Sequence, residues 1–230
     1  MWRRPIIAGE HERQAERARS SGLTGPNGMT MSLRIAEESM ALLGEHADIP
    51  IAFRVDRVLL ASTPSAGLGG ITFTETPVES PWIKDYDAID GEGPTRWVTH
   101  FDTSQWGLLA AHDDDLRVGG AVIAFRSADV HMLEGRSDLA VLWDLRVRPE
   151  VRSSGVGAAL FHAAEEWSLA RGCRTLRVET QNVNVPACRF YARMGCTLGA
   201  INLFAYPQLP AEAQMIWVKE LADATRPRVA

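Results

Sequence analysis

Residues 151–160, Val-Arg-Ser-Ser-Gly-Val-Gly-Ala-Ala-Leu, decide the fold, because they join a predicted strand to a predicted helix through a turn with two glycines. Upstream, Leu139–Val147 is apolar on both faces over its first half, which is typical of a central strand. Downstream, Gly155–Arg171 places apolar side chains at helical spacing, and Gly172 ends that helix. The segment therefore predicts a strand–turn–helix unit of an α/β domain.

The turn itself predicts a binding site for an anion. A helix N-terminus presents N–H groups that have no partner within the helix, at the positive end of the helix dipole. Gly155 and Gly157 let an anion approach the backbone, and the Arg152 guanidinium has a geometry suited to phosphate. Together these groups predict a pyrophosphate site. Its predicted residues are Arg152, Ser153, Ser154, Gly155, Val156, Gly157 and Ala158.

Other phosphate-binding loops fit this turn less well. A Walker A loop needs a lysine directly after its last glycine, and no lysine lies near this turn. A dinucleotide-binding fingerprint needs a third glycine at the position where Leu160 stands. A glycine-containing turn with no ligand is the remaining alternative, and Arg152, three residues before the first glycine, argues against it.

The rest of the chain predicts more strands and helices. The helix Pro186–Met194 is expected between the strands Thr175–Thr180 and Thr197–Ala205. Asp113–Asp115 interrupts an apolar pattern, which predicts a hairpin with the three aspartates in its turn. The remaining predictions are strands over Pro50–Leu60, Arg117–Phe125 and Met215–Leu221, a loop at Gly67–Gly70, loops and short helices over Thr76–Thr95, and one bent strand or two over Trp97–Phe101 and Gly107–Ala111.

Composition and charge limit the function classes. Of the 230 residues, 46% are hydrophobic and 23% charged, as in ordinary globular proteins, and the net charge of -5 gives no reason to expect nucleic acid. No apolar run has the length of a signal peptide or a membrane span. Cys173, Cys188 and Cys196 form no CxxC pair, so we expect reduced thiols and no metal site. These features predict a cytoplasmic protein without a membrane partner.

The first 28 residues differ in composition from the rest. Ser20–Gly22 and Gly25–Gly28 have the composition of a linker. We expect residues 1–28 to be a mobile extension with one short helix over Glu10–Ser20. The domain is then expected over residues 29–222, followed by a C-terminal tail over residues 223–230.

Two motifs together resemble the GNAT superfamily of N-acetyltransferases. The first is Arg152-x-x-Gly-x-Gly at the start of a helix, and the second is Asn-x-x-Ala-x-x-x-Tyr, here Asn184-Val-Pro-Ala-Cys-Arg-Phe-Tyr191. The resemblance covers the chain from Leu139 to Leu221 and implies acetyl-CoA as the cofactor. It also implies a GNAT-like α/β fold (α+β mixed), in which helices flank a mostly antiparallel central sheet that splays between two parallel strands.

The resemblance implies further roles on the cofactor side. The strands 139–147 and 175–180 would splay apart to admit the pantetheine arm, which would pair with the first of them as an added strand does. The Val147 N–H would polarise the thioester carbonyl, and Asn184 would hydrogen-bond the arm. The cofactor-binding residues implied outside the turn are Leu145, Arg146, Val147, Asn184, Ala187 and Tyr191.

Three shorter stretches are similar to the streptothricin acetyltransferases, which acetylate an amine of a cationic antibiotic. They are Glu179-Thr-Gln-Asn182, directly before the second motif, Asp85-Tyr-Asp87, and Ile216-Trp217. This resemblance implies streptothricin as the substrate and antibiotic resistance as the role. Another aminoglycoside-like drug, a polyamine or a protein amine remain alternative acceptors.

Tyr191 and Glu179 are two of the predicted catalytic residues. The phenol of Tyr191 can protonate a departing thiolate, although its position on the helix also suits a core aromatic. Glu179 also lies in a strand interior, where a carboxylate is costly unless it has a partner, so it is the second candidate to act on the substrate. An ion pair with Arg177 or Arg189 is the alternative for Glu179.

Asp144 is the third predicted catalytic residue. A carboxylate in a mostly apolar central strand is costly unless it is paired. By strand alternation it is expected to share a face with Leu142 and Arg146. Its predicted role is to accept the proton of the amine or to hold the cationic substrate. A salt bridge to Arg146 or Arg148 is the alternative.

The expected partner is a small cationic amine. Aromatic faces and carboxylates both attract ammonium groups, so Trp82, Asp85, Tyr86 and Asp87 are predicted to line the substrate pocket together with Asp144. A loop packed on the core is the alternative for these four residues. The protein is expected to be a monomer or a homodimer. A non-catalytic acyl-CoA sensor and a dinucleotide-dependent oxidoreductase are the alternatives from other function classes.

Overall fold

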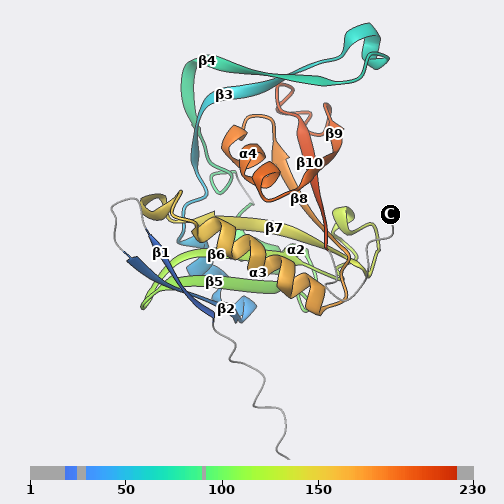
Figure 1. The fold of residues 1–230 in the computed structure, drawn as a ribbon. Helices are drawn as coiled ribbons and strands as arrows, with labels where there is room; N and C mark the ends of the chain where they lie inside the picture. Colours follow the sequence, from blue (N-terminus) through green and yellow to red (C-terminus); the bar gives the residue numbers. More distant parts are fainter. Residues whose placement is uncertain (1–18, 25–29, 90–91, 222–230) are drawn as a thin grey trace, which may run out of the picture.

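The computed structural model describes residues 19–24, 30–89 and 92–221, which form one eight-stranded sheet, a separate two-stranded ribbon and several helices (Figure 1). The sheet contains β1 (Arg19–Thr24), β2 (Thr30–Glu38), β5 (Gly107–Asp113), β6 (Leu116–Ala124), β7 (Leu139–Val147), β8 (Thr175–Gln181), β9 (Thr197–Asn202) and β10 (Gln214–Glu220). The ribbon contains β3 (Phe53–Ser62) and β4 (Thr72–Lys84). The α-helices are α1 (Leu43–Ala47), α2 (Pro94–His100), α3 (Val156–Ala170) and α4 (Val185–Arg193), and short 3-10 turns lie at η1 (Met40–Leu42), η2 (Pro64–Gly67), η3 (His131–Leu133) and η4 (Pro149–Val151).

The sheet is split at its middle. Its strands follow the order β1-β2-β5-β6-β7-β8-β10-β9, and all neighbours run antiparallel except β7 and β8. The parallel pairing begins at Leu139 opposite Thr175 and ends at Leu142 opposite Val178. Beyond that point both strands continue, and no strand of the described chain fills the space between them. The predicted fold, mostly antiparallel and splayed between two parallel strands, is confirmed.

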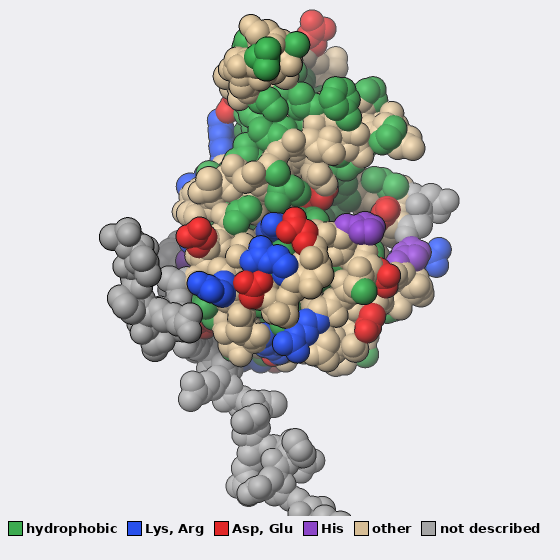
Figure 2. Space-filling model, turned by 90° about the vertical axis from the view of Figure 1, so that its right-hand side faces the viewer, with side chains coloured by type: hydrophobic (Ala, Val, Ile, Leu, Met, Phe, Trp, Pro, Cys, Tyr) green, Lys and Arg blue, Asp and Glu red, His purple; other side chains and the backbone are tan. Residues whose placement is uncertain are grey.

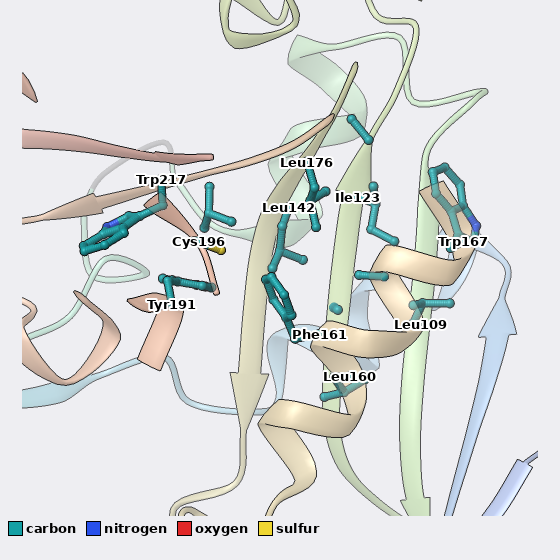
Figure 3. Packing of buried hydrophobic residues seen from close by; sticks show 14 of the residues in the cluster. Leu109, Ile123, Leu142, Leu160, Phe161, Trp167, Leu176, Tyr191, Cys196 and Trp217 are labelled. Carbon is teal, nitrogen blue, oxygen red and sulfur yellow. The ribbon is translucent and has the colours of Figure 1, made fainter. Parts of the chain in front are cut away.

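Helices cover both faces of the sheet and enclose two apolar clusters. α3 packs on one face against β5, β6 and β7, and its buried side follows the helical spacing seen in the sequence (Figures 1 and 3). α1 and α2 pack together on the opposite face, where Trp97 and Trp106 join the second cluster. The side chains of α3 that the first cluster buries include Val156, Leu160, Phe161, Ala164 and Trp167.

A register shift in β7 changes which side chains face the site. Leu142 lies opposite Ile123, but Asp144 lies opposite Val122, so Trp143 is the extra residue of a β-bulge. Before the bulge, Leu142 faces the α3 cluster, and after it Leu145 packs against that same cluster. The prediction that Asp144 shares a face with Leu142 is therefore wrong, because the bulge reverses the alternation.

The ribbon of β3 and β4 projects beyond the sheet and crosses above α4 (Figure 1). Asn182, buried at the end of β8, holds it: the Leu59 N–H donates to the Asn182 carbonyl at 3.0 Å, and Asn182 Nδ2 donates to the Leu59 carbonyl at 2.9 Å. Hydrophobic side chains gather over the upper part of the molecule in Figure 2. The exposed large hydrophobic side chains of the described residues include Leu68 and Phe204.

The predicted elements from β7 onward agree with the structure within a few residues, as does the hairpin whose turn contains Asp114 at φ 51°. Two predictions in the N-terminal half are wrong. Thr76–Thr95 is expected to form loops and short helices, yet residues 76–84 lie in β4, and only its last two residues begin the helix α2. Trp97–Phe101 was expected to be a strand, yet it lies in and directly after α2. Strand β2 and helix α1 have no counterpart among the predictions.

The N-terminal boundary also differs from the expected one. β1, inside the predicted extension, pairs antiparallel with β2 from Arg19 opposite Ile35 to Thr24 opposite Thr30. The sheet therefore begins at Arg19, because Ser20–Gly22 pair as a strand instead of acting as a linker. Most of the short helix expected over Glu10–Ser20 lies outside the described residues, and so does the predicted C-terminal tail.

Candidate active site

A cavity of about 750 Å³ opens where β7 and β8 diverge. The turn before α3 and residues along the length of α4 line it, and β7 and β8 contribute their diverging ends. On the other side lie the segments after β4 and before α2. The predicted site residues in its lining are Tyr86, Asp87, Asp144, Leu145, Arg146, Val147, Arg152, Ser153, Gly155, Gly157, Ala158, Glu179, Asn184, Ala187 and Tyr191.

The turn before α3 has the backbone geometry of an anion site. Gly155 is the N-cap residue and has φ +99°, a left-handed conformation that favours glycine. Gly157 follows within the first helical turn and lines the cavity without a side chain. Ser154 and Val156 are buried instead: the Ser154 hydroxyl donates to the Val151 carbonyl at 2.6 Å. The turn therefore offers backbone N–H groups rather than the hydroxyl of Ser154.

Arg152 lies at the cavity but already has hydrogen-bond partners. Its Nε donates to the Val147 carbonyl at 3.1 Å, and its two Nη atoms donate to the carbonyls of Ala52 at 3.2 Å and Pro50 at 2.9 Å. These contacts join the end of β7 to the segment that leads into β3. Only the guanidinium N–H groups that these carbonyls leave over can bind a phosphate.

Asn184 explains the spacing of the second motif. It is the N-cap of α4, and its Oδ1 accepts a hydrogen bond from the Ala187 N–H at 3.2 Å, the N3 position of the helix. Its side chain also lies in the cavity lining. The amide oxygen is thus used to start the helix, and the amide nitrogen is the group that can reach a ligand.

Tyr191 is a buried aromatic that also reaches the cavity. It lies in the apolar cluster together with Phe161 (Figure 3). Its ring centre is 5.1 Å from that of Phe190 and 6.0 Å from that of Phe161. Its hydroxyl forms no hydrogen bond with any described residue, and the ring belongs to the cavity lining. Burial, followed by the nearby charge of Asp144, raises the pKa of the phenol above its usual value. Tyr191 is therefore protonated at neutral pH.

Asp144 is paired twice. His46 Nε2 donates to its Oδ1 at 2.8 Å, and Arg146 Nε donates to the same oxygen at 2.9 Å. Burial raises the pKa of Asp144, but the hydrogen bonds and charges of His46 and Arg146 outweigh it and hold the pKa below its usual value. The salt bridge to Arg146, predicted as the alternative for Asp144, is present.

Glu179 has neutral partners only. The Tyr206 hydroxyl donates to its Oε1, and Gln214 Nε2 donates to its Oε2 at 2.7 Å. The ion pairs predicted as alternatives are absent in the described chain, because Arg177 pairs with Glu134 and Arg189 pairs with Glu75. Glu179 is thus a carboxylate in the cavity wall whose charge no described basic side chain neutralises.

The structure separates the four predicted substrate residues. Tyr86 and Asp87 line the cavity, where the Tyr86 hydroxyl donates to Gln181 and Asp87 accepts from Arg146. Trp82 does not line it: it lies on the exposed part of β4. Asp85 does not line it either, since its Oδ1 accepts from the Asp87 N–H and shapes the turn.

Sequence reasoning missed three residues that hold the carboxylates in place, namely His46, Tyr206 and Gln214. His46 lies 98 residues before Asp144, and a single histidine on a short helix gives no signal of such a contact. Tyr206 follows β9 in a turn-rich segment, and Gln214 opens β10, so neither belongs to a motif. Only the antiparallel pairing of Gln214 with Gln181 across β10 and β8 brings it near Glu179.

The described residues include no group of three or more His, Cys, Asp or Glu side chains placed to hold a metal ion. None of the helices in the described ranges is long and apolar enough to cross a membrane.

Comparisons with known proteins agree with the geometry. A family model described as the acetyltransferase (GNAT) family matches residues 75–196. The streptothricin acetyltransferase of Escherichia coli is 43% identical over 84 residues, which cover 35% of this chain and only about half, 48%, of that relative. Streptothricin acetyltransferase A of Bacillus subtilis (strain 168) is 28% identical over 167 residues, or 67% of this chain and 82% of that protein.

A solved structure shows the same fold. It is a candidate streptothricin acetyltransferase of Bacillus anthracis str. Ames in complex with acetyl coenzyme A. The TM-score is 0.63 at 23% sequence identity, and the match covers 84% of this chain and 99% of the other. At this identity the likeness concerns the fold alone.

Proposed function

This chain belongs to the GNAT family of acetyltransferases, and from that premise we propose that it transfers acetyl from acetyl-CoA to a primary amine of streptothricin. The observation that carries the proposal is the cavity in which the glycine turn of α3, the unpaired edge of β7, Tyr191 and Glu179 meet. A resemblance to streptothricin acetyltransferases over 67% of the chain supports the choice of acceptor. The role is then resistance to a cationic antibiotic.

The coenzyme side of the cavity fits acetyl-CoA, which supplies an activated acetyl thioester. Gly155 and Gly157 leave the N–H groups at the start of α3 open to a pyrophosphate. Residues 143–147 of β7 have no described strand beside them on the β8 side, so their backbone groups can pair with the amide-bearing pantetheine arm. The Val147 N–H and the Asn184 amide nitrogen are the proposed donors to the thioester carbonyl and to the arm.

The acceptor side has one unneutralised carboxylate. Asp144 and Asp87 share the guanidinium of Arg146, whereas Glu179 has no ion-pair partner among the described residues. We therefore assign Glu179 to the ammonium form of the substrate or to the proton that the amine loses. Asp144 is a poor base in this arrangement, because its lowered pKa reflects a carboxylate that His46 and Arg146 keep ionised.

Tyr191 is the proposed general acid. When the amine nitrogen bonds to the acetyl carbon and the carbon–sulfur bond breaks, the departing sulfur needs a proton. The Tyr191 hydroxyl has no hydrogen-bond partner among the described residues and is held protonated by its raised pKa. We propose that it gives this proton to the sulfur as the thiolate departs and recovers one from solvent.

The test is release of free thiol from acetyl-CoA across a panel of amines that includes streptothricin, kanamycin, spermidine and a peptide with a free N-terminus. The protein itself adds little background, because all three of its cysteines are buried and burial raises the pKa of Cys173 and Cys196 to about 11. We expect the highest kcat/KM with streptothricin. Thiol release that depends on another amine instead would replace the acceptor but keep the enzyme class.

The variant Glu179→Gln belongs in the same assay. It keeps the side-chain size and removes the charge, so KM for the amine should rise about tenfold or more while KM for acetyl-CoA stays within about twofold. An unchanged amine KM and kcat would remove Glu179 from the acceptor site. Tight binding of CoA with no amine-dependent release by the wild type would contradict catalysis and favour the acyl-CoA sensor.

A further inference from the structure

A buried chain of polar side chains leads from the far side of the sheet to the cavity wall. His46 Nε2 donates to Asp144 at 2.8 Å, and Arg146 Nε and Nη2 donate to the Asp144 carboxylate at 2.9 to 3.1 Å. Arg146 then donates to both oxygens of Asp87, with its Nη1 at 2.5 Å and its Nη2 at 2.9 Å. Its Nη1 also donates to the Ile49 carbonyl at 3.2 Å.

The inner side chains of this hydrogen-bonded series are buried. The His46 side chain is 0% exposed and that of Arg146 is 1% exposed, whereas the Asp87 side chain is 28% exposed in the cavity wall. Gly120 makes room for the ring, because a Cβ at that position would lie 2.4 Å from His46 Nδ1. Burying charged and polar side chains costs free energy, which hydrogen bonds among them only offset. We therefore expect a buried arrangement of this kind to serve the function of the protein.

We propose that His46 is a positioning residue for the acceptor amine, acting through Asp144 and Arg146 on the carboxylate of Asp87. This inference rests on the proposed function, because it assigns Asp87 to the amine-bearing substrate. His46 itself does not touch the cavity.

Exposure explains why Asp87 is the end that meets the substrate. Of the three side chains Asp144, Arg146 and Asp87, only Asp87 is substantially open to solvent, and it lies in the cavity wall. Asp87 lies in the segment after β4, and its side-chain bonds to the sheet are those to Arg146. Arg146 can hold the Asp87 carboxylate in place only while Asp144 fixes the guanidinium. The Asp144 oxygen that accepts from Arg146 Nε also accepts from His46 Nε2, so His46 helps to hold Asp144 in position.

The experiment compares His46→Leu with His46→Gln. Leucine removes the donor, whereas glutamine places an amide N–H near the position of Nε2. With whichever amine the wild type acetylates best, His46→Leu should raise KM for the amine about tenfold, and His46→Gln should restore it to within about threefold of the wild type. KM for acetyl-CoA should stay within about twofold in both variants. His112→Leu, in β5 near Glu38 and outside the cavity lining, is the matched control and should leave both KM values unchanged.

A merely structural role predicts a different result. His46→Leu would then lower the melting temperature and raise KM for the amine and for acetyl-CoA equally. His46→Gln would not restore the amine KM alone. The double variant His46→Leu/Asp87→Asn gives a second measurement: if His46 acts through Asp87, the two effects on amine KM should be clearly less than multiplicative. Fully multiplicative effects, or an unchanged amine KM in His46→Leu, would overturn the proposal.

A crystal structure of His46→Leu tests the positioning step without any substrate. We expect the bidentate contact between Arg146 and Asp87 to be lost or displaced. An unchanged contact would overturn the role of His46 even if the wild type acetylates streptothricin. Conversely, a wild type that acetylates none of the amines contradicts the proposed function, while the geometry of His46→Leu still decides the positioning step.

Discussion

At the scale of single residues, Tyr191 shows how a core position and a catalytic position can coincide. Its ring packs among Phe161 and Phe190, the residue belongs to the cavity lining, and its hydroxyl has no hydrogen-bond partner in the described chain. Burial favours the neutral phenol, and the nearby carboxylate of Asp144 favours it further, since both disfavour a phenolate. The apolar surroundings that suggest a structural role therefore also keep the acid in its proton-bearing form.

Tyr191→Phe should accordingly lower kcat roughly 100-fold, the scale of a lost general acid, while the dissociation constant for CoA stays near that of the wild type. Phenylalanine keeps the ring contacts, so the melting temperature should change little. In the wild type, activity should rise with pH as the amine loses its proton. Because the pKa of Tyr191 is raised, its titration should not end that rise below about pH 10. Steady-state kinetics over pH and calorimetry with CoA provide the measurements, and an unchanged kcat would exclude Tyr191 as the acid.

Spacing made some residues predictable and left others hidden. Asn184 and Tyr191 were predicted because both lie on one helix at fixed intervals, and the structure places Asn184 as the cap and Tyr191 at the cavity. Asp144 was predicted because a carboxylate in an apolar strand needs a partner. His46 was missed because its partner is distant in sequence, and the bulge at Trp143 was missed because alternation assumes an unbroken ladder.

At the scale of elements, the start of α3 depends on two glycines for different reasons. Gly155 has φ +99°, which an L side chain rarely adopts. Gly157 has helical geometry, and a Cβ there would meet Phe190 and Val147 at ordinary distances of 3.6 to 3.7 Å. Both glycines, however, line the cavity where the pyrophosphate is proposed to bind.

The two alanine variants should therefore separate stability from binding. Gly155→Ala should lower the free energy of unfolding by about 1–2 kcal/mol, because alanine at this positive φ strains the backbone. It should also lower the affinity for CoA. Gly157→Ala should leave stability unchanged or raise it by up to about 1 kcal/mol, because alanine suits a helix, and should still weaken CoA because its methyl group enters the cavity. Urea unfolding and CoA titration measure the two effects. A Gly157→Ala protein with normal CoA affinity would show that the ligand does not approach this turn.

Packing on the core also determines which helices and strands the sequence predicts well. β7, α3, β8 and α4 pack on a core and carry strong periodicity, so their predicted bounds lie within a residue or so of the observed ones. β4 belongs to a ribbon that is mostly exposed on both faces and contains two prolines, so it has no apolar face to give a signal. α2 buries only Pro94 and Trp97, too few side chains to set a helical period.

At the scale of the whole molecule, Asn182 joins parts that are distant along the chain. Besides its bonds to Leu59 of the ribbon, its Oδ1 accepts from the Ala213 N–H at 2.7 Å, and its own N–H donates to the Ala213 carbonyl at 3.1 Å. One buried side chain thus connects the ribbon, the end of β8 and the segment that leads into β10. Asn182 is the last residue of the stretch Glu179-Thr-Gln-Asn182 that resembles the streptothricin acetyltransferases, so this stretch also has a structural role.

Asn182→Ala should therefore destabilise the protein as a unit. It leaves the Leu59 carbonyl and the Ala213 N–H without their side-chain partner, and unmet buried groups of this kind cost about 2–3 kcal/mol together. For a domain of this size the melting temperature should fall by about 4–12 °C. Asn202→Ala is the matched control, since exposed Asn202 makes one similar bond, to the Phe204 N–H at 2.9 Å, and should shift the melting temperature by less than about 2 °C. Equal melting temperatures for the two variants would mean that the ribbon is held by its packing on α4 rather than by Asn182.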